Sequence, residues 1–223
     1  MNLDTVWSDL DRVLVSPSLL SADPANILEG VRLVERAGAD VLHVDIMDGH
    51  FVPNMSFGPN LVRALSKHSA LPLEIHLMVD NPEVMAPMFA DAGAHILAFH
   101  REVTPHPHRL LLEIRDMGCL AGIAYAPSSP LDDLHLLKHV VDEVVIMGVD
   151  PGFSGGRFIS TTFDRVRTAA DIVSGERIRV AVDGGVDLSN AAPLRQAGAR
   201  LLVSGSTLYA SEDPTETVRL LRG

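Results

Sequence analysis

The feature that most constrains the fold is a junction that recurs along the chain, where a helical pattern closes on Ala-Gly-Ala and an apolar run follows. It occurs at residues 37–39, 92–94 and 197–199, and in the weaker form Met-Gly-Cys at residues 117–119. Glycine just past the last helical residue commonly adopts the left-handed conformation that ends a helix. Each junction therefore predicts a helix followed directly by a strand.

Short apolar runs predict eight strands with helical patterns between them. They lie at residues 13–18, 40–46, 71–78, 95–100, 119–125, 143–149, 178–183 and 200–204. Strands that alternate with helices favour parallel β/α units, and eight units close a (β/α)8 TIM barrel. An open doubly wound sheet is the alternative. It would scatter the polar residues at the ends of strands 2, 3 and 7, whereas a barrel gathers them at one mouth. We predict a single α/β domain, a (β/α)8 barrel over residues 13–223, after an N-terminal extension, residues 1–12, without a catalytic role.

Composition narrows the classes of partner and compartment. A net charge of −11 over 223 residues disfavours nucleic acid and anionic membrane as partners, because both need a basic face. No apolar run approaches the roughly 20 residues that span a bilayer, and the N-terminus lacks the pattern of a secretory signal. The single cysteine, Cys119, suits a reducing compartment. We expect a cytoplasmic protein that binds neither nucleic acid nor membrane.

Four polar side chains at predicted strand ends are candidate metal ligands. His43 and Asp45 are two residues apart in the second strand, so their side chains share one face. His76 ends the third strand and Asp183 ends the seventh. A buried carboxylate beside a buried histidine is costly without a metal, a proton or a partner charge. Two imidazoles and two carboxylates suit one divalent transition metal ion (Zn, Fe, Mn or Co) and leave positions open for a substrate.

Other titratable residues carry less information. The pattern around His135 and His139 predicts that they lie on the exposed edge of a helix rather than in a metal site. His100 and Glu102 end the fourth strand, and a role for them behind the metal ligands stays open. The only lysines in the chain are both in helical or helix-end contexts, so no strand end offers an amine for a Schiff base. The segment 45–48 also lacks the lysine that some barrel decarboxylases interleave with their aspartates.

Three glycine-bearing turns follow the late strands, at residues 151–156, 183–185 and 204–206. Barrels commonly hold phosphate in the loops after strands 7 and 8. The net charge would repel a phosphate, so the site must be built locally from backbone N–H groups. The turns together predict a phosphate cradle.

The chain resembles the ribulose-phosphate 3-epimerase family from residue 14 to about 210. The motifs that carry the resemblance are Ser-Pro-Ser-Leu-Leu-Ser-Ala-Asp at 16–23, His-Val-Asp-Ile-Met-Asp-Gly-His-Phe-Val-Pro-Asn at 43–54, His-Leu-Met-Val at 76–79, Met147, Pro-Gly-Phe at 151–153 and Val-Asp-Gly-Gly at 182–185. The resemblance implies a metal held by the four ligands named above, with Asp45 and Asp183 doubling as acid and base. It also implies that Ser18 contacts the sugar and that three methionines line the site. The candidate substrate-binding residues are Ser18, Met47, His76, Met78, Met147, Gly152, Phe153, Ser154, Gly155, Gly156, Gly184, Gly185, Gly205 and Ser206.

The implied reaction is metal-dependent epimerisation at C3 of a ketose phosphate, D-ribulose 5-phosphate to D-xylulose 5-phosphate, through an enediolate. The chain departs from the family's usual pattern at Glu74, Ala126, Gly148, Asp150, Ser154 and Gly156. These changes spare the four metal residues but leave two alternatives open. One is a 3-epimerase of a hexulose or tetrulose phosphate, and the other is a non-catalytic phosphosugar-binding barrel. We expect a small sugar phosphate as the ligand and a homo-oligomer as the assembly.

Overall fold

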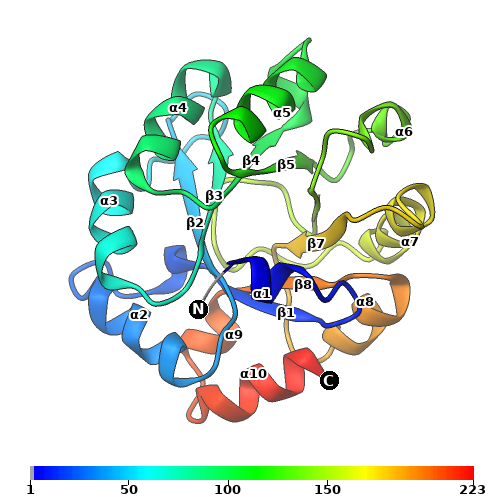
Figure 1. The fold of residues 1–223 in the computed structure, drawn as a ribbon. Helices are drawn as coiled ribbons and strands as arrows, with labels where there is room; N and C mark the ends of the chain where they lie inside the picture. Colours follow the sequence, from blue (N-terminus) through cyan, green and yellow to red (C-terminus); the bar gives the residue numbers. More distant parts are fainter. Residues whose placement is uncertain (1–2) are drawn as a thin grey trace.

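The computed structural model describes residues 3–223, which form a ring of eight parallel strands surrounded by helices (Figure 1). The strands are Leu14–Pro17 (β1), Leu42–Met47 (β2), Leu73–Met78 (β3), Ile96–His100 (β4), Leu120–Tyr125 (β5), Glu143–Met147 (β6), Arg179–Asp183 (β7) and Leu201–Ser204 (β8). The helices are Leu3–Trp7 (α1), Ile27–Arg36 (α2), Pro59–His68 (α3), Pro82–Ala92 (α4), Pro107–Asp116 (α5), Leu134–Leu137 (α6), Thr162–Ile172 (α7), Ala191–Ala197 (α8), Ser206–Tyr209 (α9) and Pro214–Arg222 (α10), with 3-10 turns at Leu19–Ser21 (η1) and Arg101–Val103 (η2).

The strands follow one another around the sheet in the order β1-β8-β7-β6-β5-β4-β3-β2. A parallel bridge between Ser18 and His43 joins β1 to β2 and brings the two ends of the sheet together. The prediction of a single-domain (β/α)8 barrel is therefore confirmed, and the open doubly wound sheet is excluded. Each of the eight predicted strands is present. The sixth strand ends at Met147, two residues earlier than predicted, and Gly148 N–H then donates to the Asp183 carbonyl at 2.6 Å.

The predicted helix-to-strand junctions are confirmed by their backbone. Gly38, Gly93, Gly118 and Gly198 all have φ between 82° and 113°. This left-handed region is open to glycine and strained for residues with a Cβ. Gly93 and Gly198 are the residues that cap α4 and α8.

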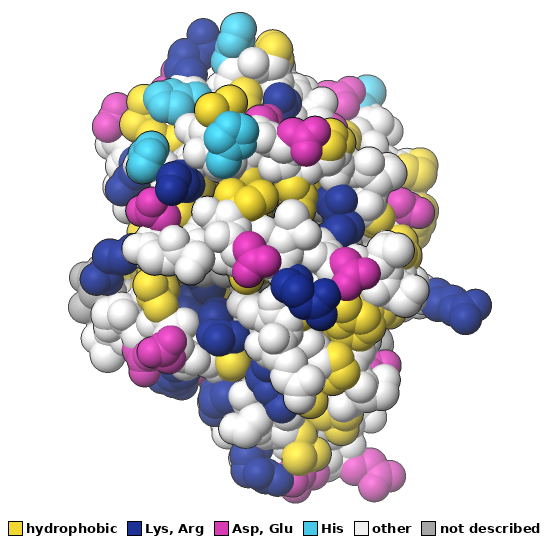
Figure 2. Space-filling model, turned by 90° about the vertical axis from the view of Figure 1, so that its right-hand side faces the viewer, with side chains coloured by type: hydrophobic (Ala, Val, Ile, Leu, Met, Phe, Trp, Pro, Cys, Tyr) yellow, Lys and Arg dark blue, Asp and Glu magenta, His cyan; other side chains and the backbone are white. Residues whose placement is uncertain are grey.

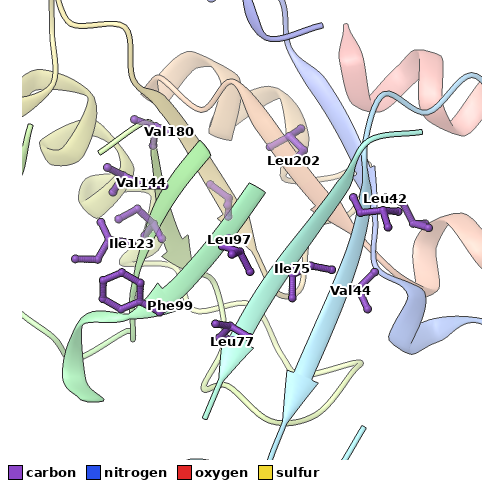
Figure 3. Packing of buried hydrophobic residues seen from close by; sticks show 14 of the residues in the cluster. Leu42, Val44, Ile75, Leu77, Leu97, Phe99, Ile123, Val144, Val180 and Leu202 are labelled. Atoms are coloured by element: carbon purple, nitrogen blue, oxygen red, sulfur yellow. The ribbon is translucent and has the colours of Figure 1, made fainter. Parts of the chain in front are cut away.

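Side chains that point outward from the strands are large and aliphatic. Leu42 and Val44 on β2, and Ile75 and Leu77 on β3, are fully buried between the sheet and its helices (Figure 3). Each such side chain stabilises the fold by about 1.5–3 kcal/mol. These outward residues supply most of the hydrophobic core.

Side chains that point inward alternate with these and include polar and small residues beside a second, smaller apolar cluster. Ala98, Gly122 and Ala181 leave space along the axis of the barrel. A Cβ on Gly122 would lie 2.7 Å from the Cβ of Ala98 and 3.2 Å from a carboxylate oxygen of Glu143. The glycine therefore makes room for a buried acid inside the barrel.

A buried arginine and the N-terminal segment close the amino-terminal mouth of the barrel, where α1 lies across the ring of strands (Figure 1). The guanidinium of Arg179 lies 5.0 Å from the centre of the Trp7 ring. It donates to the carbonyls of Arg12 at 2.8 Å, Asp9 at 2.9 Å, Arg200 at 3.0 Å and Trp7 at 3.4 Å. Burial lowers the pKa of Arg179 to about 10 although Glu143 and other acids lie nearby. Residues 1 and 2 of the predicted extension lie outside the described residues.

Within residues 3–223, no helix is both long enough and apolar enough to cross a membrane.

Candidate metal centre and active site

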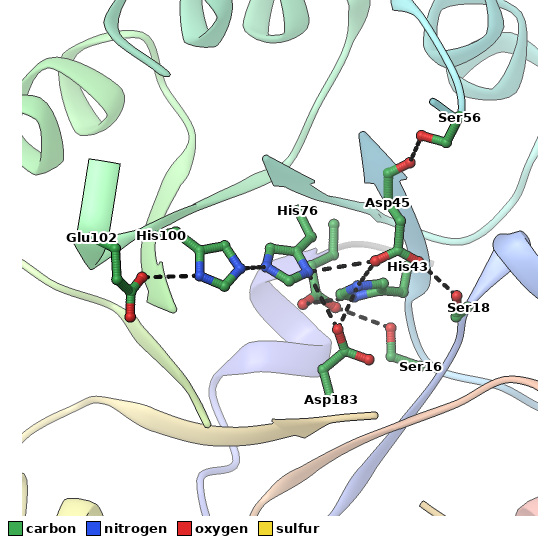
Figure 4. Close-up of polar contacts among 10 residues, drawn as sticks. Ser16, Ser18, His43, Asp45, Ser56, His76, His100, Glu102 and Asp183 are labelled. Carbon is green, nitrogen blue, oxygen red and sulfur yellow. Dashed lines mark hydrogen bonds and ion pairs between the residues drawn. The ribbon is translucent and has the colours of Figure 1, made fainter. Parts of the chain in front are cut away.

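The four predicted metal ligands converge inside the barrel from β2, β3 and β7, and only Asp183 is the last residue of its strand (Figure 4). Asp45 pairs in register with His76 on the neighbouring strand, and His43 lies two residues earlier on the same face of β2. Asp183 ends β7. Each residue offers one donor atom, and the four donor atoms lie within 4.8 Å of one another, all on buried residues.

The donor atoms face a common point. His43 Nε2 lies 3.2 Å from Asp45 Oδ1 and 3.6 Å from Asp183 Oδ2. His76 Nδ1 lies 3.5 Å and 3.3 Å from the same two oxygens. In the part of the chain that the structure describes, His76 Nδ1 is buried without a hydrogen bond of good geometry. Two imidazole nitrogens and two carboxylate oxygens that converge in this way fit a divalent transition metal ion.

Electrostatics in this cluster favour a positive charge. Burial lowers the pKa of His43, but the charges of Glu74, Asp45 and Asp183 outweigh it and hold that pKa well above its usual value. Burial lowers the pKa of His76 as well, but the nearby carboxylates of Asp183 and Asp45 outweigh it and the net shift is upward. Burial raises the pKa of Asp45, but the two histidines outweigh it and the net shift is downward. Without an ion, protons on the imidazoles compensate the carboxylates.

Hydroxyl groups on flanking segments fix the Asp45 carboxylate and its backbone. Ser18 Oγ donates to Asp45 Oδ2 at 2.7 Å. Ser56 Oγ donates to the Asp45 carbonyl at 2.5 Å and accepts from the Met47 N–H at 3.0 Å. One oxygen of Asp45 is therefore held by a serine, while the other faces the histidines.

Two buried acids, Glu74 and Glu143, lie beneath His43 and were not among the predicted site residues. His43 Nδ1 lies 3.0 Å from Glu74 Oε1, and Ser16 Oγ donates to Glu74 Oε2 at 3.0 Å. Glu143 is fully buried, and neither of its oxygens has a hydrogen-bond partner among residues 3–223. Burial, together with the charge of Glu74, holds the pKa of Glu143 well above its usual value. The sequence signal that could have identified Glu74 and Glu143 is the presence of an acidic residue at an inward position of a predicted apolar strand.

His100 and Glu102, whose role the sequence left open, lie directly behind His76. His76 Nε2 lies 3.0 Å from His100 Nε2, and His100 Nδ1 lies 3.0 Å from Glu102 Oε2. Burial lowers the pKa of His100 to about 4. Burial raises the pKa of Glu102, but hydrogen bonds from His100, Ser129 and the Ala126 N–H outweigh it and bring the pKa to about 2.

A cavity of about 500 Å³ opens above the four ligands. The candidate residues that line it are Ser18, Asp45, Met47, Met78, Met147, Gly152, Phe153, Ser154, Gly155, Gly156, Asp183, Gly184, Gly185, Gly205 and Ser206. His43 and His76 lie beneath the cavity rather than in its wall. The three methionines are buried, and the glycine turns form the rim.

Loops far apart in sequence are joined at the rim of this cavity. Asn54 Nδ2 donates to the Gly152 carbonyl at 2.8 Å, which ties the loop after β2 to the loop after β6. Asn190 Nδ2 donates to the Gly185 carbonyl at 2.8 Å and shapes the turn after β7. Asn190, Ser21 and Arg157 line the cavity and were not among the predicted residues. Ser21 lies in the motif at residues 16–23 but was not singled out there, whereas the segments of Asn190 and Arg157 carry no motif that marks them as site residues.

The positions where the chain departs from the family's usual pattern differ in their surroundings. Ser154 and Gly156 line the cavity, whereas Asp150 is exposed and is not in its wall. A Cβ on Gly148 would lie 2.2 Å from the Gly184 carbonyl oxygen, so only glycine fits this backbone. The Ala126 N–H donates to Glu102. Glu74 lies directly behind His43, whereas the other departures touch the rim and its supports, and the four ligands themselves are unchanged.

The sequence matches the model of the ribulose-phosphate 3 epimerase family over residues 14–209. It is 40% identical over 217 residues to the ribulose-phosphate 3-epimerase of Bacillus subtilis, covering 95% of this chain and 99% of that protein. It is 42% identical over 212 residues to the protein of the same name from Mycobacterium leprae, with 94% and 93% covered. It is also 40% identical over 211 residues to the chloroplastic ribulose-5-phosphate-3-epimerase of Arabidopsis thaliana, with 93% and 75% covered.

Solved structures with a similar fold are more distant in sequence. The tryptophan synthase α-subunit of Pyrococcus furiosus superposes with a TM-score of 0.69 at 17% identity, with 95% of this chain and 97% of that chain covered. The orotidine 5′-phosphate decarboxylase of Pyrococcus horikoshii gives 0.66 at 14% identity, with 94% and 97% covered. At these identities the likeness concerns the fold alone.

Proposed function

The chain belongs to the ribulose-phosphate 3-epimerase family, and from that premise we propose that it interconverts D-ribulose 5-phosphate and D-xylulose 5-phosphate by inversion at C3. The observation that carries the proposal is the placement of two carboxylates at the floor of one cavity. Asp45 reaches it from β2 and Asp183 from β7, and both lie within 3.6 Å of the same histidine nitrogen. Inversion requires such a pair, because a proton must leave one face of C3 and return on the other.

His43, Asp45, His76 and Asp183 would hold a divalent transition metal ion, of which Zn, Fe, Mn and Co all suit this donor set. When bound, the ion would supply positive charge that stabilises the enediolate. The chain's own contribution is to keep the donors in place: Ser18 fixes one oxygen of Asp45, and Glu74 backs His43. The assignment is supported by His76 Nδ1, which is buried among residues 3–223 without a hydrogen bond of good geometry.

We assign Asp45 and Asp183 as the acid–base pair. A carbonyl at C2 acidifies the C3 hydrogen, so one carboxylate removes it and the other returns a proton to the opposite face. The roles exchange with the direction of the reaction. Burial raises the pKa of Asp45, but the two imidazoles outweigh it and lower the pKa, which suits a base that is ionised before the reaction begins.

Met47, Met78 and Met147 form a dry floor that offers no competing proton. We assign the phosphate group to the glycine turns at the rim, where backbone approaches the ligand closely. Gly184 and Gly185 have φ of 99° and 67°, which a residue with a Cβ adopts only with strain. Ser154, Gly155, Gly156, Gly205 and Ser206 complete the proposed cradle, with Gly152 and Phe153 on the same loop as the first three.

A panel of ketose phosphates tests the substrate assignment against its alternatives. We expect D-ribulose 5-phosphate to be converted with a much higher kcat/KM than a hexulose 6-phosphate, a tetrulose 4-phosphate or unphosphorylated D-ribulose. Faster turnover of a hexulose or tetrulose phosphate would reassign the substrate. Tight binding of the whole panel without turnover would instead identify a phosphosugar-binding barrel.

We propose a cytoplasmic location and a homo-oligomeric assembly without nucleic acid. The buried free thiol of Cys119 supports a reducing compartment. Basic and acidic side chains are intermixed on the face of the molecule in Figure 2, which does not favour a polyanion. Val84 and Met88 on α4 are 59% and 43% exposed and offer apolar surface for a second copy. Light scattering of the purified chain tests the assembly.

A further inference from the structure

A chain of three polar side chains runs away from the proposed metal position on the side of β4. It begins at His76, continues through His100 at the end of β4 and finishes at Glu102 in η2 (Figure 4). The proposed function uses only the first of these residues. The geometry of the other two determines which nitrogen of His76 is free to bind a cation.

The position of each imidazole hydrogen follows from Glu102, the last of these three side chains. A carboxylate only accepts hydrogen bonds, so at 3.0 Å from Glu102 Oε2 it is His100 Nδ1 that carries a hydrogen. A neutral imidazole has one N–H, which leaves a lone pair on His100 Nε2. At 3.0 Å from that lone pair, His76 Nε2 must donate. In the neutral form of His76, which is the form that binds a metal ion, Nδ1 is then left without a hydrogen, and it is the nitrogen that faces Asp45 and Asp183.

The opposite arrangement places repelling groups together. If His76 carried its hydrogen on Nδ1, its Nε2 would accept from His100 Nε2, and the lone pair of His100 Nδ1 would face the Glu102 carboxylate. A lone pair against an anion at hydrogen-bond distance is unfavourable. Glu102 therefore selects the tautomer of His76 from two side chains away.

Contacts with neighbouring residues keep His76, His100 and Glu102 in place. Glu102 Oε1 accepts from the Ala126 N–H at 2.9 Å and from Ser129 Oγ. The rings of His76 and His100 are nearly coplanar, with planes at 20° and centroids 5.0 Å apart, and they face each other through their Nε2 atoms. The ring of Phe51 packs against His100 with centroids 4.6 Å apart. The imidazole of His100 is thereby held at a fixed angle between the ligand and the carboxylate.

We propose that His100 and Glu102 are positioning residues that orient the Nδ1 lone pair of His76 toward the cation and so set the metal affinity. This inference rests on the proposed function, since it takes His76 as a metal ligand. It assigns to two residues outside the cavity a role in metal binding rather than in contact with the sugar. Partners of this kind typically change metal affinity by about 10–100-fold when they are removed.

The test is the dissociation constant of Co²⁺ for the full-length, metal-stripped chain. Co²⁺ alone serves as the probe, its visible absorption reports the ligand field, and a competing chelator brings the affinity into range. His100→Phe keeps a ring in contact with Phe51 but offers no acceptor to His76 Nε2, so Co²⁺ binding should weaken by about 10–100-fold. Glu102→Gln keeps the shape but removes the charge, and it should weaken binding by less.

A double variant separates a relay from two independent effects. If Glu102 acts through His100, adding Glu102→Gln to His100→Phe should weaken Co²⁺ binding no further. The matched control is Glu113→Gln, which removes an exposed carboxylate on α5 near Arg109 and should leave the dissociation constant unchanged. A purely structural role would lower the melting temperature of the variants without moving the dissociation constant.

Three results would overturn the proposal, and one of them reaches further. Unchanged Co²⁺ affinity in Glu102→Gln overturns it even if His100→Phe does not fold. Additive losses in the double variant overturn the relay through His100. Absence of Co²⁺ binding by the wild-type chain would remove the metal centre itself, and the proposed mechanism with it, whereas the first two results leave the metal centre intact.

Discussion

Replacement of Arg179 by methionine should cost a large share of the stability of the chain. Its guanidinium is buried at the amino-terminal mouth, over the Trp7 ring, and it bonds to four backbone carbonyls. Three of those bonds measure 2.8–3.0 Å. Methionine fills much of the same volume but leaves the carbonyls of the N-terminal segment and of Arg200 without this donor.

The size of the effect follows from two opposing contributions. Three hydrogen bonds from a charged group contribute about 2 kcal/mol each, or about 6 kcal/mol. Burial opposes this, because a pKa lowered from 12.5 to about 10 corresponds to about 3 kcal/mol against the charged form. The difference is about 3 kcal/mol, and the carbonyls left unpaired add about 1–2 kcal/mol. We therefore expect Arg179→Met to lower the free energy of unfolding by about 3–5 kcal/mol.

Urea unfolding followed by circular dichroism measures this difference directly. The matched control is Arg177→Met, two residues earlier and exposed, which should change the free energy of unfolding by no more than about 0.5 kcal/mol. A loss below about 1 kcal/mol in Arg179→Met would refute the reasoning. The N-terminal segment would then cover the barrel without being held by this arginine.

Three further predictions concern the ion, the buried acid and the rim. A chelator should lower the melting temperature little at pH 5.5 and much more at pH 9. The raised pKa of His43 stabilises the metal-free fold below the unfolded value of 6.5, and this contribution is lost as pH rises through the folded pKa. Glu143→Gln should raise the free energy of unfolding relative to wild type by a margin that grows with pH above 4.5, by up to about 1.4 kcal/mol per pH unit. The reason is that the raised carboxyl pKa makes wild-type stability fall as pH rises there, and equal margins at pH 5 and pH 8 in urea unfolding would contradict this. Gly205→Val should raise KM for the sugar phosphate about 10-fold or more in steady-state assays, with little change in kcat. Even a Cβ at this position would lie 2.3 Å from Ser21 Oγ, so the turn that we assign to the phosphate would have to shift.

The barrel was predictable because its signals are local. Each strand is a short apolar run, and each Ala-Gly-Ala junction fixes where a helix must stop. The convergence of His43, Asp45, His76 and Asp183 followed from their positions at strand ends, because a barrel brings the carboxyl ends of its strands to one mouth. These inferences needed the order of the elements but no detail of their packing.

The supports of the site were harder to predict because they depend on strand register and closure. Glu74 contacts His43, and His100 contacts His76, across neighbouring strands whose alignment the sequence does not specify. Glu143 and Arg179 begin strands at positions that suggest solvent, yet the closed barrel buries both. Their burial could be predicted only from the closed barrel, because its interior holds polar side chains beside small and apolar ones.

Solvent deuterium exchange at C3 tests the two-carboxylate mechanism most directly. NMR in D₂O would follow wild-type, Asp183→Asn and Asp45→Asn chains, with metal content measured on the same samples because both residues are proposed ligands. Wild type should incorporate deuterium at C3 of the product. Each variant with metal bound should wash deuterium into one epimer without forming the other, with opposite preferences and kcat lowered about 10²-fold or more. Interconversion of the epimers at near wild-type rate by either metal-loaded variant would contradict the mechanism.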